Sequence, residues 1–142
     1  MNRSVLTKYI ICCLMSLIIF CSMMGASGAS AKSHDPVNAL LELLAGNDRF
    51  SSGQSTHPNL SAERRELVTS GGQHPFATVI ACSDSRVPVE MLFDQGVGDI
   101  FVIKVAGNVC NTDEIGSIEY GVDHLDTPVM VVLGHTHCGA CT

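Results

Sequence analysis

The chain has 142 residues, a formal net charge of −6, 14 acidic residues against eight basic ones, and seven cysteines. This length is enough for one small domain. The acidic balance, with neither a basic patch nor an aromatic platform, excludes a nucleic-acid-binding protein and mainly implies solubility.

Residues 1–31 have the pattern of a secretory signal peptide. Arg3 and Lys8 form a basic start, residues 9–24 form an apolar run, and small residues follow to an A-x-A cleavage pattern. We therefore expect a periplasmic or secreted protein, with a mature domain over residues 32–142 and no membrane attachment after cleavage. An uncleaved membrane anchor is the alternative, although the apolar run is shorter than the roughly 20 residues that a spanning helix needs.

Two helices are predicted at the start of the mature chain. Residues 36–50 carry leucines at near-helical spacing, with Asp35 as the N-cap and Pro36 at the first helical position. This helix is expected to be amphipathic. A polar loop over residues 51–60 leads to a short helix over residues 61–68, whose first residue is a serine N-cap.

The rest of the chain alternates between strand and helix patterns. Apolar runs predict strands over residues 76–81, 100–105 and 129–133, and helices are predicted between them over residues 89–93 and 112–125, the latter capped by Thr112. The runs are continuous, which indicates strands that are buried on both faces. The predicted fold class is therefore α/β, a parallel sheet with right-handed crossovers and flanking helices.

Cysteine and histidine follow the first and third predicted strands. Cys82 ends the first strand, and His135 and Cys138 follow the third. If these strands are neighbours, as in a 2-1-3 order, their carboxyl ends meet and the three side chains converge. Two thiols and an imidazole suit Zn²⁺ and leave a fourth position open, as in catalytic zinc sites. The alternatives are buried thiols with a core histidine, or disulfides in an exported protein.

A carboxylate and a guanidinium lie just beyond the first of these cysteines. Arg86 can hold Asp84 in a bidentate pair, so that Asp84 orients a zinc-bound hydroxide instead of binding the metal. Direct binding of Asp84 to zinc, which would close the site, and a simple surface ion pair are the alternatives. Because two thiolates neutralise the ion, we expect activity to rise toward alkaline pH.

Five short motifs occur together along the chain. They are Leu-x-x-Gly-Asn-x-Arg-Phe (43–50), Cys-Ser-Asp-Ser-Arg-Val (82–87), Gly-Asp-Ile-Phe-Val (98–102), Ala-Gly-Asn (106–108) and Gly-His-Thr-His-Cys-Gly-Ala (134–140). In combination they closely resemble the β-class carbonic anhydrases, from about residue 36 to the last residue.

This resemblance implies a function and a set of site residues. Zinc would be bound by Cys82, His135 and Cys138, with the Asp84–Arg86 pair gating the fourth ligand. Zinc-bound hydroxide would attack carbon dioxide to give bicarbonate in a reversible reaction. The resemblance also implies a homodimer or a higher even oligomer, cemented partly by N-terminal helices, and a substrate-binding role for Gln95.

Two departures from the family pattern leave other functions open. The chain stops four residues after Cys138, where family members continue. We therefore expect a truncated domain, and a zinc-binding but inactive fragment is the first alternative. Cys141 completes a Cys-x-x-Cys motif, so an exported thiol–disulfide oxidoreductase that uses Cys138 and Cys141 is the second. It leaves Cys82, Asp84 and Arg86 unexplained.

Overall fold

The computed structural model describes residues 35–141, so the predicted signal peptide lies outside the described residues. Within this range no helix combines the length and the apolar character that crossing a bilayer requires. Three strands form one parallel sheet in the order β2-β1-β3, which confirms the predicted order. Their bounds are β1 Ala77–Cys82, β2 Ile100–Val105 and β3 Met130–Leu133.

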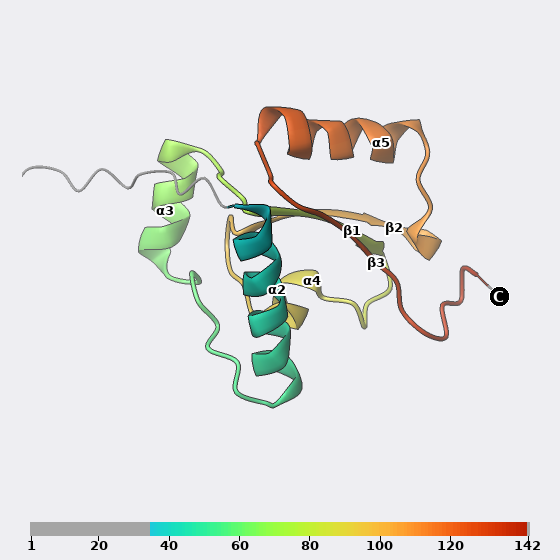
Figure 1. The fold of residues 1–142 in the computed structure, drawn as a ribbon, viewed down its shortest axis with the longest axis horizontal. Coiled ribbons are helices and arrows are strands. Elements are labelled where there is room, and N and C mark those ends of the chain that lie inside the picture. Colours follow the sequence, from blue (N-terminus) through green and yellow to red (C-terminus); the bar gives the residue numbers. More distant parts are fainter. Residues whose placement is uncertain (1–34, 142) are drawn as a thin grey trace, which may run out of the picture. The chain divides into compact units, whose positions relative to one another are not determined.

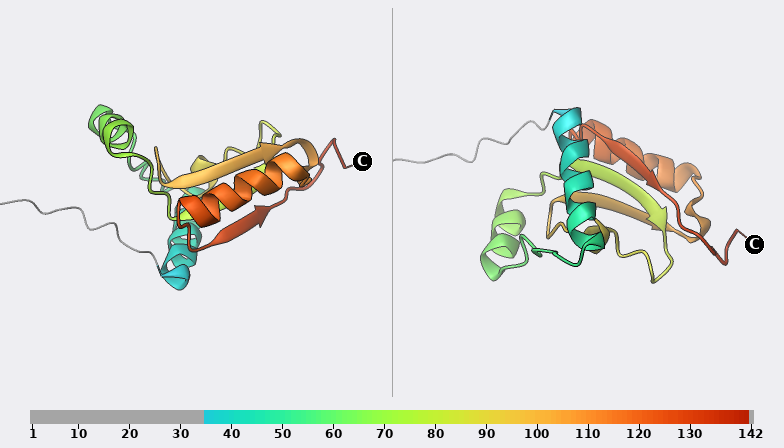
Figure 2. Two further views of the ribbon diagram at one scale, coloured as in Figure 1. Left: turned by 90° about the horizontal axis from the view of Figure 1, so that it is seen from above. Right: turned by 60° about the horizontal axis from the view of Figure 1, so that its bottom comes forward.

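Helices cover both faces of this sheet. α5 (Thr112–Glu119), continued by a π-helical turn η2 (Tyr120–His124), lies over one face, and α2 (Pro36–Ser51) and α4 (Val89–Leu92) lie over the other (Figure 1 and Figure 2). α3 (Ala62–Gly71) precedes β1, and a 3-10 turn η1 (Ala106–Asn108) follows β2. The predicted α/β class is therefore confirmed, with a helix in each crossover between strands.

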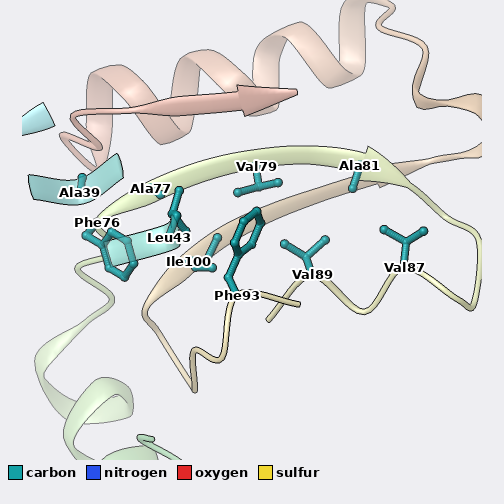
Figure 3. Packing of buried hydrophobic residues seen from close by; sticks show 10 residues of the cluster. All are labelled: Ala39, Leu43, Phe76, Ala77, Val79, Ala81, Val87, Val89, Phe93 and Ile100. Carbon is teal, nitrogen blue, oxygen red and sulfur yellow. The ribbon is translucent and has the colours of Figure 1, made fainter. Parts of the chain in front are cut away.

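The hydrophobic core lies between β1 and the helices α2 and α4 (Figure 3). Alternate residues of β1 point into it, as the two-residue period of a strand requires, and Leu43 of α2 packs there with only 1% of its surface exposed. On the opposite face of β1, Thr78 is buried and lies so close to Gly121 that a side chain at position 121 would collide with it. The central strand is thus buried on both faces.

The expectation that all three strands are buried on both faces is wrong for β3. Met130 and Val132 are exposed, at alternate positions of this strand. β3 pairs only with β1 in the described part of the chain, so its other edge and one of its faces are uncovered. The apolar run predicted a strand correctly, but burial depends on which elements cover it.

The helix N-termini follow the predictions in part. Ser61 caps α3, because its hydroxyl accepts a hydrogen bond from the Arg64 N–H. Asp35 occupies the N-cap position of α2, but its side chain makes no capping hydrogen bond. The predicted cap of α5 is wrong by one residue. Asn111 is the cap, and its N–H donates to the carboxylate of Glu114, one half of a capping box.

A buried carboxylate fastens the C-terminal end of α2 and the following loop to the domain. Asp94 accepts hydrogen bonds from the Arg49 guanidinium, from the N–H and hydroxyl of Thr56 and from the His57 N–H. The Arg49 hydrogen bond, supported by that of the Thr56 N–H, holds the pKa of Asp94 well below its usual range. The residue therefore stays ionised although it is enclosed by protein.

Candidate metal centre

Parallel pairing brings the two predicted ligand segments together. Cys82 is the last residue of β1, and its neighbour Ala81 pairs with Leu133, the last residue of β3. His135 follows two residues later, at the same end of the sheet. The apolar run predicted a strand over residues 76–81, and β1 extends one residue further to include Cys82.

Cys82, His135 and Cys138 form a cluster that could hold a metal ion. One donor atom from each residue lies within 4.8 Å of the others. The two Sγ atoms are 3.8 Å apart. Two thiolates bound at about 2.3 Å in a tetrahedral arrangement would lie about 3.8 Å apart, whereas a disulfide needs about 2.05 Å. The cysteines of the described range are all free, so the arrangement fits a shared metal and not a disulfide.

The imidazole of His135 has one ring nitrogen, Nε2, without a hydrogen-bond partner among the described residues. Its Nδ1 lies 3.0 Å from the Thr136 carbonyl oxygen, which assigns the proton to Nδ1. Its Nε2 is buried and has no hydrogen-bond partner among residues 35–141. Metal-binding histidines typically donate their second ring nitrogen to a carbonyl in this way. A buried, unpaired lone pair beside two thiols makes a donor set that could bind a cation, and these donors suit zinc.

Backbone groups around Cys82 favour its thiolate form. The N–H of Asp84 lies 3.4 Å and that of Gly107 lies 3.3 Å from Sγ. The Asp84 N–H has the largest effect on the Cys82 thiol, the nearby His135 ring the second largest, and the Gly107 N–H the third. Together they lower the pKa of Cys82 to about 7. The thiolate is the form that binds a metal, so the site is prepared for one.

Asp84 and Arg86 form the bidentate pair expected from the sequence. Arg86 Nε lies 2.9 Å from Oδ1 and its terminal nitrogen lies 2.7 Å from Oδ2, and the backbone N–H of Arg86 also donates to Oδ1. These bonds hold the pKa of Asp84 well below its usual range. The carboxylate lies beside the cluster, with Oδ2 3.8 Å from His135 Nε2. The pair is thus an ionised group at the edge of the cluster, and not an isolated surface ion pair.

Arg86 also connects the two segments that supply the cluster. Its terminal nitrogen donates to the carbonyl of His137 at 3.1 Å. His137 presents that carbonyl from a left-handed backbone conformation with φ of 54°, which non-glycine residues adopt only at some cost. Local sequence patterns do not predict this contact, because it joins residues 51 positions apart. The hydrogen bond from the Gly107 N–H to the Cys82 thiol, across 25 positions, was not predicted either.

The structure does not bring Gln95 to the cluster. Gln95 lies in the turn before β2, at the amino end of the sheet, and is buried beside Gly46 of α2. Cys82 pairs with Val105 at the other end of β2. Within one chain Gln95 therefore lies away from the cluster, and its substrate-binding role stays a prediction.

Comparison with known proteins agrees with this geometry. Residues 77–142 match the family model described as carbonic anhydrase. Over 106 residues the chain is 51% identical to a carbonic anhydrase of Mycolicibacterium smegmatis and 47% identical to carbonic anhydrase 2 of Mycobacterium tuberculosis. Each alignment covers 75% of this chain and 51% of the relative, so the chain spans about half the length of these curated relatives.

Solved structures show the same fold. The β-carbonic anhydrase CcaA superposes with a TM-score of 0.52 at 35% identity, over 70% of this chain and 50% of that one. A Coccomyxa β-carbonic anhydrase gives 0.51 at 34% identity, over 72% of this chain and 46% of the other. The chain therefore belongs to the β-class carbonic anhydrase family.

Proposed function

We propose that this protein catalyses the reversible hydration of carbon dioxide to bicarbonate and a proton at a zinc ion. The observation that carries the proposal is the unpaired Nε2 of His135, buried beside two thiols at the separation expected for zinc and next to a clamped carboxylate. Family membership supports the same reaction, since the matched relatives are carbonic anhydrases.

The residues that would hold zinc are Cys82, His135 and Cys138, which leave one position of a tetrahedral ion open. When bound, zinc supplies a Lewis acid that activates water as a nucleophile near neutral pH. Two thiolates weaken that activation, because their charge offsets that of the ion. We therefore expect turnover to rise toward alkaline pH, and a rate that is flat from acidic to alkaline conditions would contradict this reasoning.

Asp84 would orient the reacting water, and Arg86 would fix Asp84. The carboxylate is ionised across the neutral range, so it accepts hydrogen bonds and does not donate them. Both of its oxygens are held by Arg86, which restrains the carboxylate from swinging onto the metal. In this arrangement Asp84 would accept a hydrogen bond from the attacking water, which would turn an oxygen lone pair toward carbon dioxide.

We further propose an exported homodimer or higher even oligomer. Export is supported by the signal-peptide pattern of residues 1–31. Oligomerisation is supported by the side of α2 that faces away from the core, where Val37, Leu40, Leu41 and Leu44 are exposed. A matched relative from Sordaria macrospora is described as tetrameric.

Stopped-flow measurement of carbon dioxide hydration tests the reaction, with zinc content measured on the same samples. Asp84→Asn keeps the hydrogen-bonding shape but loses the charge, and we expect it to retain zinc while turnover falls by about 10²-fold or more. Asp48→Asn, a change of the same kind at an exposed position of α2, is the matched control. Turnover unaffected by Asp84→Asn would contradict the proposed role of the carboxylate.

Zinc binding without any turnover would favour the second candidate, a zinc-binding protein that is inactive as this chain. The chain spans about half the length of its curated relatives. The thiol–disulfide oxidoreductase has less support, because Cys138 lies in the cluster with Cys82 and His135.

A further inference from the structure

Cys141 is a thiol next to the metal centre that the proposed reaction does not use. It is exposed and free, and its Sγ lies 3.7 Å from the carbonyl oxygen of Gly107. The N–H of the same Gly107 donates to Cys82 Sγ. One glycine therefore contacts both thiols, which puts Cys141 at the rim of the centre. Gly107 also has φ of 73°, and a side chain there would press on Ala140 and Cys141.

The backbone between Cys138 and Cys141 is already folded as a disulfide requires. The Cys141 N–H donates to the Cys138 carbonyl oxygen at 3.1 Å and closes a four-residue turn. In such a turn the first and last Cα atoms lie within about 7 Å. Disulfides span Cα separations of about 4.4 to 6.8 Å. Bond formation therefore needs rotation of two side chains and little movement of the backbone.

Oxidation should select this pair over Cys82 and Cys138, although those two sulfur atoms are 3.8 Å apart. Cys82 has only 3% of its surface exposed, ends the central strand, and is held by two backbone N–H groups. An oxidant in solution reaches the exposed Cys141 first. Cys138, three residues away across the turn, is then the thiol in position to complete the reaction.

We propose that Cys138 and Cys141 form a thiol–disulfide switch that withdraws Cys138 from the metal centre. This inference rests on the proposed function, since it concerns regulation of the same site. The oxidant is a low-molecular-weight disulfide. The Cys141 sulfur attacks it, forming a mixed disulfide and releasing one thiol, which takes up the Cys141 proton. The Cys138 thiolate then attacks the Cys141 sulfur, the protein disulfide forms, and the second small thiol leaves and takes a proton from water.

Closing the switch removes one of three protein ligands. The two protein sulfur atoms lose two electrons, which reduce the small disulfide to two thiols. Cys82 and His135 alone make a poor zinc site, so the ion is released. Because exported proteins meet oxidising conditions, the redox state of the compartment would set the fraction of loaded protein. A dithiol reductant and fresh zinc would restore the centre.

The test treats the reduced, zinc-loaded protein with oxidised glutathione. Three quantities are followed: zinc retained per chain, the disulfides identified by mass spectrometry of peptides, and carbon dioxide hydration. We expect the unmodified protein to form the Cys138–Cys141 disulfide and lose its zinc, and to recover both thiols and zinc after dithiothreitol. Cys141→Ser should keep its zinc under the same treatment. Cys110→Ser, which removes another exposed thiol of the described range, is the matched control and should behave like the unmodified protein.

Zinc loss from Cys141→Ser as fast as from the unmodified protein would overturn the switch, as would a disulfide mapped to Cys82 and Cys138. Retention of zinc by the oxidised unmodified protein would overturn it as well. A reduced protein that binds zinc but does not hydrate carbon dioxide would overturn the proposed function, while the zinc and disulfide measurements would still decide the switch. A reduced protein that binds no zinc would overturn both.

Discussion

Leu43→Ala is the sharpest test of how α2 docks on the sheet. Leu43 has 1% of its surface exposed and packs in the core with β1 and α4. The change removes three carbon atoms, worth about 2.4 kcal/mol at roughly 0.8 kcal/mol per methylene. Incomplete collapse of the cavity raises the expected loss of unfolding free energy to about 3 to 5 kcal/mol. Urea unfolding, followed by circular dichroism, measures this loss directly.

Leu41→Ala is the matched control, since it makes the same substitution in the same helix. Leu41 is 55% exposed, so its loss should cost less than about 1 kcal/mol. The change in helix propensity is the same at both positions and cancels in the comparison. Equal effects at the two positions would refute the docking of α2 through Leu43. A larger effect at Leu41, growing with protein concentration, would mean that the outer side of α2 is buried between copies of the chain.

Three further perturbations test the metal centre, the helix packing and the buried carboxylate. Iodoacetamide should label Cys82 and Cys138 after chelation of zinc but not before, and equal labelling of both states would argue against these ligands. Gly121→Ala places a methyl group against β1, and we expect it to lower unfolding free energy by about 1 to 3 kcal/mol; unchanged stability would contradict the close approach of η2. Asp94→Asn removes a carboxylate whose folded-state pKa is lowered, chiefly by Arg49, so the stability it contributes is present above the unfolded pKa of about 3.9 and is lost as pH falls further. The stability gap between Asp94→Asn and the unmodified protein should therefore narrow below about pH 4, and a constant gap from pH 7 to 3 would oppose this assignment.

Local patterns were enough to predict the sheet and the residues at its carboxyl end. The predicted strand over residues 100–105 has the bounds of β2, because its apolar run is flanked by Gly98 and Gly107, both in left-handed turns. A 2-1-3 strand order, which the structure confirms, was enough to predict that Cys82 and His135 lie at one edge of the sheet. The Asp84–Arg86 pair was predictable as well, since its members are two residues apart and follow directly from one strand.

Features that depend on distant neighbours were not predictable from local patterns. β3 has an apolar run like that of β1, yet Val132 is exposed, because no element of the described chain covers that face. Gln95 lies in a loop near α2, at the end of the sheet opposite the cluster, and this placement depends on contacts between distant segments. The bond from Arg86 to the His137 carbonyl joins two segments whose contact exists only in the folded domain.

Because the cluster is assembled from the ends of two strands, metal binding at this site would be coupled to folding. Cys82 and Cys138 are 56 residues apart, and they meet only after β1 and β3 have paired in parallel. Such non-local pairings carry a high loop-closure entropy and form slowly, typically over milliseconds to seconds. Binding free energy at a site absent from the unfolded chain becomes folding free energy. The rate of zinc uptake by refolding protein would therefore report when the most distant contact of the sheet is complete, and added zinc would slow unfolding.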